Sequence, residues 1–268
     1  MLAAGLWMAA AALLYGPVLV KLAHDWRIDP TYSHGFVVPP IALFLIWRQR
    51  ERLRAAVPRP SAAGLAILVF SLAVFAAGWL GAELFLTRIS MIGVIAGTVV
   101  YVFGWRHFRL VSFPVAFLVF MIPLPAVIFN EIAVRLQLVA SQTGEHLLRA
   151  ADVPVLRDGN VLTLANATLE VNDACSGIRS LVALISIAAL TGHVLGLGWG
   201  RRLLFGAAAV PLAIALNGVR VAATGVAVAQ FGSDAARGAL HTASGMVVFA
   251  VALACVVALH RPARMEPV

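Results

Sequence analysis

The sequence predicts an all-α polytopic membrane protein with about eight transmembrane helices, a small outer-face amphipathic helix and a β-hairpin. Three observations predict this fold class: 62% of the 268 residues are hydrophobic, only 12% are charged, and the mean hydropathy is +0.94. A chain of this length with so few polar side chains cannot cover the surface of a water-soluble protein. We therefore expect residues 1–268 to form a single polytopic membrane domain, and we exclude soluble enzymes.

Eight apolar segments divide the chain. Several are shorter than the ~20 residues that a perpendicular transmembrane helix needs, so we expect the second to begin nearer Tyr32 and the seventh to continue past Asn217. The segments are Leu2–Val20, Gly35–Trp47, Ala62–Leu80, Ile89–Phe103, Leu110–Phe129, Ile178–Val194, Leu203–Leu216 and Thr242–Leu259.

The distribution of charge predicts how these segments are oriented. If the N-terminus is internal, one side of the membrane holds Arg48–Arg59, Arg106–Arg109, Arg201-Arg202 and Arg261–Arg264. That side carries eleven basic and two acidic residues, a formal balance of +9, and the other side carries nine basic and ten acidic residues, a balance of −1. The positive-inside rule makes the first side cytoplasmic and places Asp173–Arg179 on the outer face.

Other classes of partner and chemistry have little support in the sequence. The net charge of +8 does not indicate nucleic acid, because the basic residues separate apolar segments and form no basic face. The two cysteines, Cys175 and Cys255, indicate no disulfide framework. No cofactor or metal is predicted. The first segment, Leu2–Val20, lacks a basic n-region and is expected to be retained as a span.

The outer-face loop of about residues 130–177 is the longest and has a predicted structure of its own. Asn130–Ala150 combines spaced apolar residues with charged ones, which predicts an amphipathic helix suited to the membrane interface. The pattern then changes to short strands around a tight turn at Asp158-Gly159. The expected strands are Val153–Leu156 and Val161–Leu164, and Leu169–Val171 can add a third.

A thiol lies where this polar loop meets the apolar segment that follows. If Asn172 or Asp173 caps a helix that begins near Ser176, then Cys175 falls in its first turn, where the helix dipole favours the thiolate. The negative charge of Asp173 opposes this effect. The alternative interpretation of Cys175 is a small buried apolar residue.

Two further polar groups are predicted at the same boundary. Arg220 lies in an apolar run, where a charge costs ~2.5–3.5 kcal/mol at the bilayer centre, and with Asn217 three residues earlier it forms a joint donor surface. The alternative is an arginine that extends to the lipid headgroups. His241 opens the last apolar segment, and its alternative is an interfacial histidine without a chemical role.

The predicted topology brings Cys175, Arg220 and His241 to the outer boundary from three separate segments. A thiolate nucleophile, an imidazole that transfers protons and a guanidinium that stabilises an oxyanion are the groups that cysteine-dependent acyl transfer requires. Other histidines are also expected on this side, namely His24, His34 and His146.

Three short blocks resemble the signature motifs of the exosortase/archaeosortase family: Ala174–Arg179, Asn217–Arg220 and His241–Gly245. The Tyr32–Gly35 segment and the Arg157–Asn160 hairpin are also similar to bacterial exosortases, so the resemblance extends over essentially the whole chain. It implies a membrane-embedded cysteine peptidase or transpeptidase in the cell inner membrane. Its substrates would be exported proteins that end in a Pro-Glu-Pro motif, a transmembrane helix and a basic tail.

The resemblance also implies roles for individual residues. Cys175 would be the nucleophile, Arg220 the essential arginine and His241 the general acid/base. The supporting residues would be Ser176, Gly177, Arg179 and Asn217. Membrane lipid surrounds such an enzyme, and the thioester formed on its cysteine would pass to an amine acceptor or to water.

Two other functional classes remain open from the residues alone. A transporter or lipid-handling protein would use Arg220 and His241 as substrate or proton ligands, although the sequence shows no inverted repeat. Intramembrane serine proteolysis could use Ser176 or Ser244, but no histidine is clearly placed as its base. Replacement of Cys175 by serine separates these classes, because only thiol chemistry should fail.

The charge balance generates a prediction about topology. Reporter domains fused after Arg54, Arg109 and Arg202 should be active in the cytoplasm, and fusions near Gly159 and Gly232 should be active on the exported side. Paired cytoplasmic and export reporters at each position provide the measurement. A cytoplasmic signal at Gly159 would contradict the orientation on which the candidate site depends.

Overall fold

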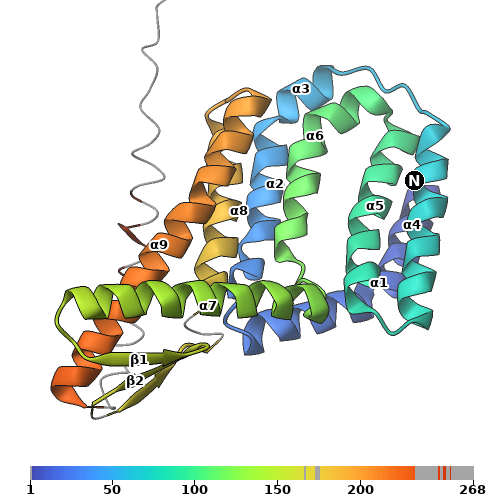
Figure 1. Cartoon of the computed structure of the whole chain (residues 1–268). Helices are drawn as coiled ribbons and strands as arrows, with labels where there is room; N and C mark the ends of the chain where they lie inside the picture. Colours follow the sequence, from blue (N-terminus) through green and yellow to red (C-terminus); the bar gives the residue numbers. More distant parts are fainter. Residues whose placement is uncertain are drawn as a thin grey trace, which may run out of the picture. The chain divides into compact units, whose positions relative to one another are not determined.

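The computed structural model (Figure 1) describes residues 2–165, 167–172 and 176–232, together with positions 247, 250, 251 and 254. By their internal contacts the residues form two compact units, Met1–Ala126 and Val127–Val268, and each is described here by itself. Within these ranges the protein is mostly helical, with several apolar helices and a small three-stranded sheet. The last predicted segment, Thr242–Leu259, lies outside the described residues apart from the four isolated positions.

The first unit is a set of helices that end where polar residues interrupt the apolar segments of the sequence. The second apolar segment begins at Ser33, near Tyr32 as expected, and Pro39 and Pro40 occupy the first turn of α2. The elements are α1 (Leu2–Ile28), the 3₁₀ helix η1 (Ser33–Phe36), α2 (Val38–Arg48), α3 (Arg50–Ala55), α4 (Ala63–Leu80), α5 (Leu84–Val102), α6 (Trp105–Phe117) and the 3₁₀ helix η2 (Leu118–Met121).

Several boundaries in this unit differ from the prediction. Helix α1 continues eight residues past Val20 to Ile28, and α6 begins at Trp105, five residues before Leu110. Helix α5 begins at Leu84, five residues before Ile89, because the Glu83 side chain accepts a hydrogen bond from the Phe85 amide at 3.3 Å and caps the helix. The expected segment Leu110–Phe129 is not one helix, since η2 ends at Met121 and the next helix begins at Ala126. Pro123 and Pro125 lie in this break, and neither can donate a helical hydrogen bond.

Glycine sets the spacing between α4 and α5. A Cβ atom placed on Gly64 would lie 2.2 Å from the backbone nitrogen of Tyr101, and one placed on Gly97 would lie 2.9 Å from Cγ of Leu68. Small residues allow two backbones to approach closely in a membrane protein, where contact between helices depends on packing.

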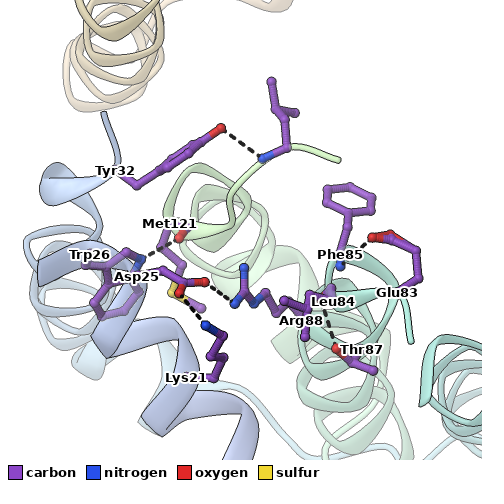
Figure 2. A network of polar contacts seen from close by, with 11 residues as sticks. Lys21, Asp25, Trp26, Tyr32, Glu83, Leu84, Phe85, Thr87, Arg88 and Met121 are labelled. Atoms are coloured by element: carbon purple, nitrogen blue, oxygen red, sulfur yellow. Dashed lines mark hydrogen bonds and ion pairs between the residues drawn. The ribbon is translucent and has the colours of Figure 1, made fainter. Parts of the chain in front are cut away.

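A polar network joins α1 to α5 and η2 (Figure 2). Asp25 forms an ion pair with Arg88 and a second with Lys21 at 3.2 Å, while Trp26 Nε1 donates to the Met121 carbonyl at 2.7 Å. Asp25, Arg88 and Trp26 each have a partner from another helix or from the next turn, which offsets part of the cost of removing them from water.

The second unit contains one long amphipathic helix, the sheet and two antiparallel helices. The elements are α7 (Ala126–Ala150), β1 (Val155–Asp158), β2 (Val161–Leu164), β3 (Thr168–Glu170), α8 (Ile178–Val194) and α9 (Trp199–Phe231). The predicted helix in the loop therefore exists but starts four residues earlier, at Ala126. All three predicted strands are present, and β2 lies between its two antiparallel neighbours.

The sheet closes a core between α7 and α9 (Figure 1). Strands β1 and β2 pair from Val155–Leu164 to Asp158–Val161, which leaves a two-residue turn at Gly159-Asn160. Gly159 has φ +59°, a conformation that glycine adopts at little cost. The buried core residues come from the two helices, the sheet and the residue after it: Ala140, Leu148, Leu162, Leu164, Leu169, Val171, Val221, Ala222 and Val228.

Helix α8 has the predicted ends, and α9 continues past Asn217 as expected, although it begins four residues before Leu203 and extends to Phe231. Its 33 residues run without a break through Pro211, Asn217 and Arg220. In the described ranges, α1, α4, α5 and α9 are long and apolar enough to cross a membrane, and α8 and η1–α2 are shorter apolar helices. These helices fit the predicted transmembrane character by their length and composition, and the count of eight spans stays a prediction.

Candidate functional site

The site is built on the middle of α9, where α7 crosses it at glycine. A Cβ atom on Gly218 would lie 2.5 Å from Cγ2 of Thr143, and one on Gly144 would lie 2.6 Å from Cγ1 of Val221. Glycine at these positions lets the two helices come close together. The packed segment of α9 is the one that contains Arg220.

Arg220 and Asn217 are both buried on this segment. Arg220 is 9% exposed, Asn217 is 4% exposed, and they lie one turn apart on α9. The Arg220 carbonyl also accepts a hydrogen bond from Thr224 Oγ1 at 2.9 Å. An arginine that merely extends to the headgroups should have an exposed guanidinium, so its burial in the protein favours an internal role.

The start of α8 lies directly against Asn217. Gly177 is the N-cap residue of α8, with φ +83°, and a Cβ atom at this position would lie 2.7 Å from Cγ of Asn217. Ser176 is 2% exposed, and its Oγ accepts a hydrogen bond from the Ile178 amide at 3.3 Å. The structure thus brings the end of the first motif into contact with the second.

The cap of α8 differs from the prediction, because Gly177 is the N-cap residue and not Asn172 or Asp173, and the first helical residue is Ile178. The left-handed conformation of Gly177 ends the helix there, and the first helical hydrogen bond runs from the Leu181 amide to the Gly177 carbonyl at 2.9 Å. The first turn therefore does not include residue 175. The dipole of α8 therefore does not favour the thiolate from within that turn.

The sheet before this region is fixed to α7 by polar contacts. Glu145, on α7, accepts a hydrogen bond from Arg157 Nε at 2.8 Å and forms an ion pair with Arg149 at 2.7 Å. Ser141 Oγ donates to the Gly159 carbonyl at 2.9 Å. These contacts hold both β1 and the β1–β2 turn on the helix that crosses α9.

Asn160 links the same turn to the end of the sheet. Its carbonyl accepts a hydrogen bond from the Val171 amide at 2.9 Å, and its Nδ2 donates to the Val171 carbonyl at 3.1 Å. Val171 is hydrogen-bonded to Asn160, and six residues later Gly177 packs against Asn217. Only residues 172–176 connect these two fixed points, and Cys175 is one of them by sequence.

The remaining predicted site residues are distributed differently. Cys175, Asp173 and His241 lie outside the described residues. Arg179 is exposed on α8, whereas Gly177 of the same motif packs against Asn217. The supporting role predicted for Arg179 stays a prediction.

The other outer-face histidines differ in their surroundings. His34 Nε2 donates to the Phe120 carbonyl at 3.0 Å, which is a structural contact within the first unit. His24 is exposed on α1. His146 is exposed on α7, turned away from the face on which Gly144 and Leu148 contact α9.

Sequence reasoning missed the contacts of Asn160 and Glu145. The pairing of Asn160 with Val171 depends on the register of three strands, and the pairing of Glu145 with Arg157 depends on how the sheet lies on α7. The predicted turn after β1 was the only feature of the local sequence that indicated where these contacts lie. Among the described residues, no three His, Cys, Asp or Glu side chains are placed to hold a metal ion together.

Comparison with known proteins identifies a family. The model of the transmembrane exosortase family matches residues 26–258, a range that includes all three motifs. Neither the curated proteins nor the solved structures contain a match. The family match extends over most of the chain and does not depend on any one of the short motifs.

The contact between Gly177 and Asn217 generates a prediction about stability. Gly177→Ala should introduce about 1–2 kcal/mol of backbone strain and a further ~1–3 kcal/mol of overpacking against Asn217. Gly159→Ala is the matched control, because φ at Gly159 is also positive but no atom lies within 4 Å of its added Cβ. Thermal unfolding in detergent should therefore show a larger loss for Gly177→Ala. Equal losses would contradict the close contact.

Proposed function

Because the chain belongs to the transmembrane exosortase family, we propose that it is a membrane-embedded cysteine peptidase or transpeptidase for the C-terminal sorting signals of exported proteins. Family membership supports a membrane transpeptidase-like role in general. The finer proposal is that the signals contain a Pro-Glu-Pro motif followed by a transmembrane helix and a basic tail. Processing would take place at the periplasmic face of the cell inner membrane.

The proposed reaction uses three residues. The Cys175 thiolate attacks the scissile carbonyl, forming a C–S bond and an oxyanion that Arg220 and nearby backbone N–H groups stabilise. When the C–N bond breaks, His241 gives a proton to the departing amine. The thioester then reacts with an amine acceptor or with water, which releases the carbonyl product and returns the thiol.

The observation that carries this proposal is the contact of Gly177 with Asn217, one helical turn from the buried Arg220. Two of the three motifs meet there although about forty residues separate them. Family membership alone would leave these residues unrelated in space. Their contact supports a shared site at which residue 175, two positions before Gly177, can act with the guanidinium.

The charge pattern supports the proposed side of the membrane. A sorting signal that stops in the bilayer presents its scissile bond near the outer boundary. The segment before Ile178 is expected there, because the opposite ends of the helices carry the balance of +9. The acceptor of the acyl group would reach the thioester from the same side.

The first test is processing of a co-expressed substrate that ends in Pro-Glu-Pro, an apolar span and arginines. The intact enzyme should shorten this substrate, and Cys175→Ala should leave it at full length because the nucleophile is gone. Gel mobility and intact mass of the substrate provide the measurement. Cys255→Ala is the matched control and should process normally. Unchanged processing by Cys175→Ala would exclude the proposed chemistry.

A second prediction concerns the arginine. Arg220→Lys keeps the positive charge but loses the planar donor group, so processing should fall by roughly 10²-fold or more, as when an oxyanion donor is removed. Arg135→Lys should have little effect, because Arg135 is exposed and its ion pair within the described ranges is with Glu131 of its own helix. The rate of substrate shortening is the measurement. Near-normal processing by Arg220→Lys would instead favour an electrostatic or structural arginine.

A further inference from the structure

The first unit contains a cavity that the proposed reaction does not use. Its volume is about 310 Å³, at the lower end of the range for small-molecule sites. It lies between residues 17–21 of α1 and the α4–α5 turn. Its lining is mostly apolar and contains two cationic side chains: the residues are Pro17, Val18, Lys21, Gly78, Trp79, Ala82, Glu83, Leu84, Thr87 and Arg88.

The cationic end of this cavity has an excess of positive charge. Asp25 is the one carboxylate that pairs with both Arg88 and Lys21, so the three side chains together carry a formal charge of +1 (Figure 2). The other acidic group of the lining, Glu83, is held at the start of α5, where its carboxylate accepts from the Phe85 amide. An anion in the cavity would complete the charge balance beside Lys21 and Arg88.

Both cations have donors left for such an anion. Arg88 is only 2% exposed, and its Nε has no hydrogen-bond partner among the described residues. A buried N–H group that makes no hydrogen bond costs about 1–3 kcal/mol, so a ligand acceptor would remove a penalty. The Lys21 side chain is 50% exposed, and Asp25 is the only partner of its ammonium in the described ranges.

The surroundings of the cavity indicate a ligand with an apolar part. Lys21 directly follows the apolar segment Leu2–Val20, so it lies where a membrane helix reaches the headgroup region. Val20, Trp79 and Leu80 are all exposed next to the cavity lining. Such side chains suit contact with acyl chains, and a tryptophan at a helix end is typical of the interface.

We propose that this cavity is a phospholipid site. The phosphodiester lies in the cavity beside the Lys21–Asp25–Arg88 group, where Lys21 and Arg88 donate charge-assisted hydrogen bonds to its oxygens. The glycerol end lies against the apolar lining, and the acyl chains continue over the exposed surface next to Trp79 and Leu80. The site is separate from the residues of the proposed reaction, so its occupancy can be measured without a sorting-signal substrate.

The test is native mass spectrometry of the full chain in detergent, titrated with phosphatidylglycerol and with a diacylglycerol that has the same acyl chains. Phosphatidylglycerol should bind at least roughly tenfold more tightly, because only it offers a phosphate to the two cations. Lys21→Gln should remove roughly tenfold of that affinity and leave diacylglycerol unchanged. Arg27→Gln is the matched control, since it removes an exposed positive charge from the same helix outside the cavity lining.

Three results would overturn the proposal. Equal binding of diacylglycerol would show an apolar surface without headgroup recognition. Equal losses in Lys21→Gln and Arg27→Gln would show attraction by overall charge alone. Displacement of phosphatidylglycerol by an equal concentration of inorganic phosphate would show an anion site to which the acyl chains contribute nothing. Unfolding midpoints of both variants verify that the fold is intact.

Discussion

Helices inside a bilayer gain little from the hydrophobic effect when they associate, because lipid tails are as apolar as their own side chains. Close approach of backbones must supply the contact, and in this protein glycine provides it. Gly64 meets the backbone of Tyr101 in the first unit, and Gly144 and Gly218 allow α7 to cross α9 in the second. Gly177 has the same role at the candidate site, where it lets the start of α8 contact Asn217.

The polar groups of the two units follow a second rule, because a buried charge is tolerated only when it has partners. Asp25 and Arg88 satisfy one another between α1 and α5, and Glu145 binds two arginines at the edge of the sheet. The sheet itself is too small to be stable alone. It depends on α7 and on the apolar core that it shares with α9, and in return it fixes the chain before residue 175.

Much of this architecture could be predicted from the pattern of apolar residues. The ends of α8 and the three strands follow directly from where apolar runs stop and turn residues begin. The start of α5 was missed because the cap at Glu83 is a contact of one side chain with a nearby amide. The break before α7 was missed because hydropathy averages over Pro123 and Pro125.

The residue types of the candidate site could be predicted from the sequence, but the contacts that hold these residues in place could not. Arg220 stood out because a charge in an apolar run needs an explanation. The contact between Gly177 and Asn217 depends on how α8 and α9 pair, and the bonds of Asn160 depend on strand register. Both are properties of tertiary structure that no local pattern contains, and the burial of Arg220 is a tertiary property as well.

The length of α9 determines how far Arg220 lies from the start of the helix. At 1.5 Å per residue its 33 residues span about 50 Å, well beyond the ~30 Å of the hydrocarbon core. Arg220 lies 21 residues after Trp199, or about 31 Å along the axis of α9. The distance of the guanidinium from the start of α9, measured along the helix axis, therefore depends on the number of residues between them. One residue inserted before Asn217 would rotate Arg220 around the axis by about 100° and move it along the axis by about 1.5 Å.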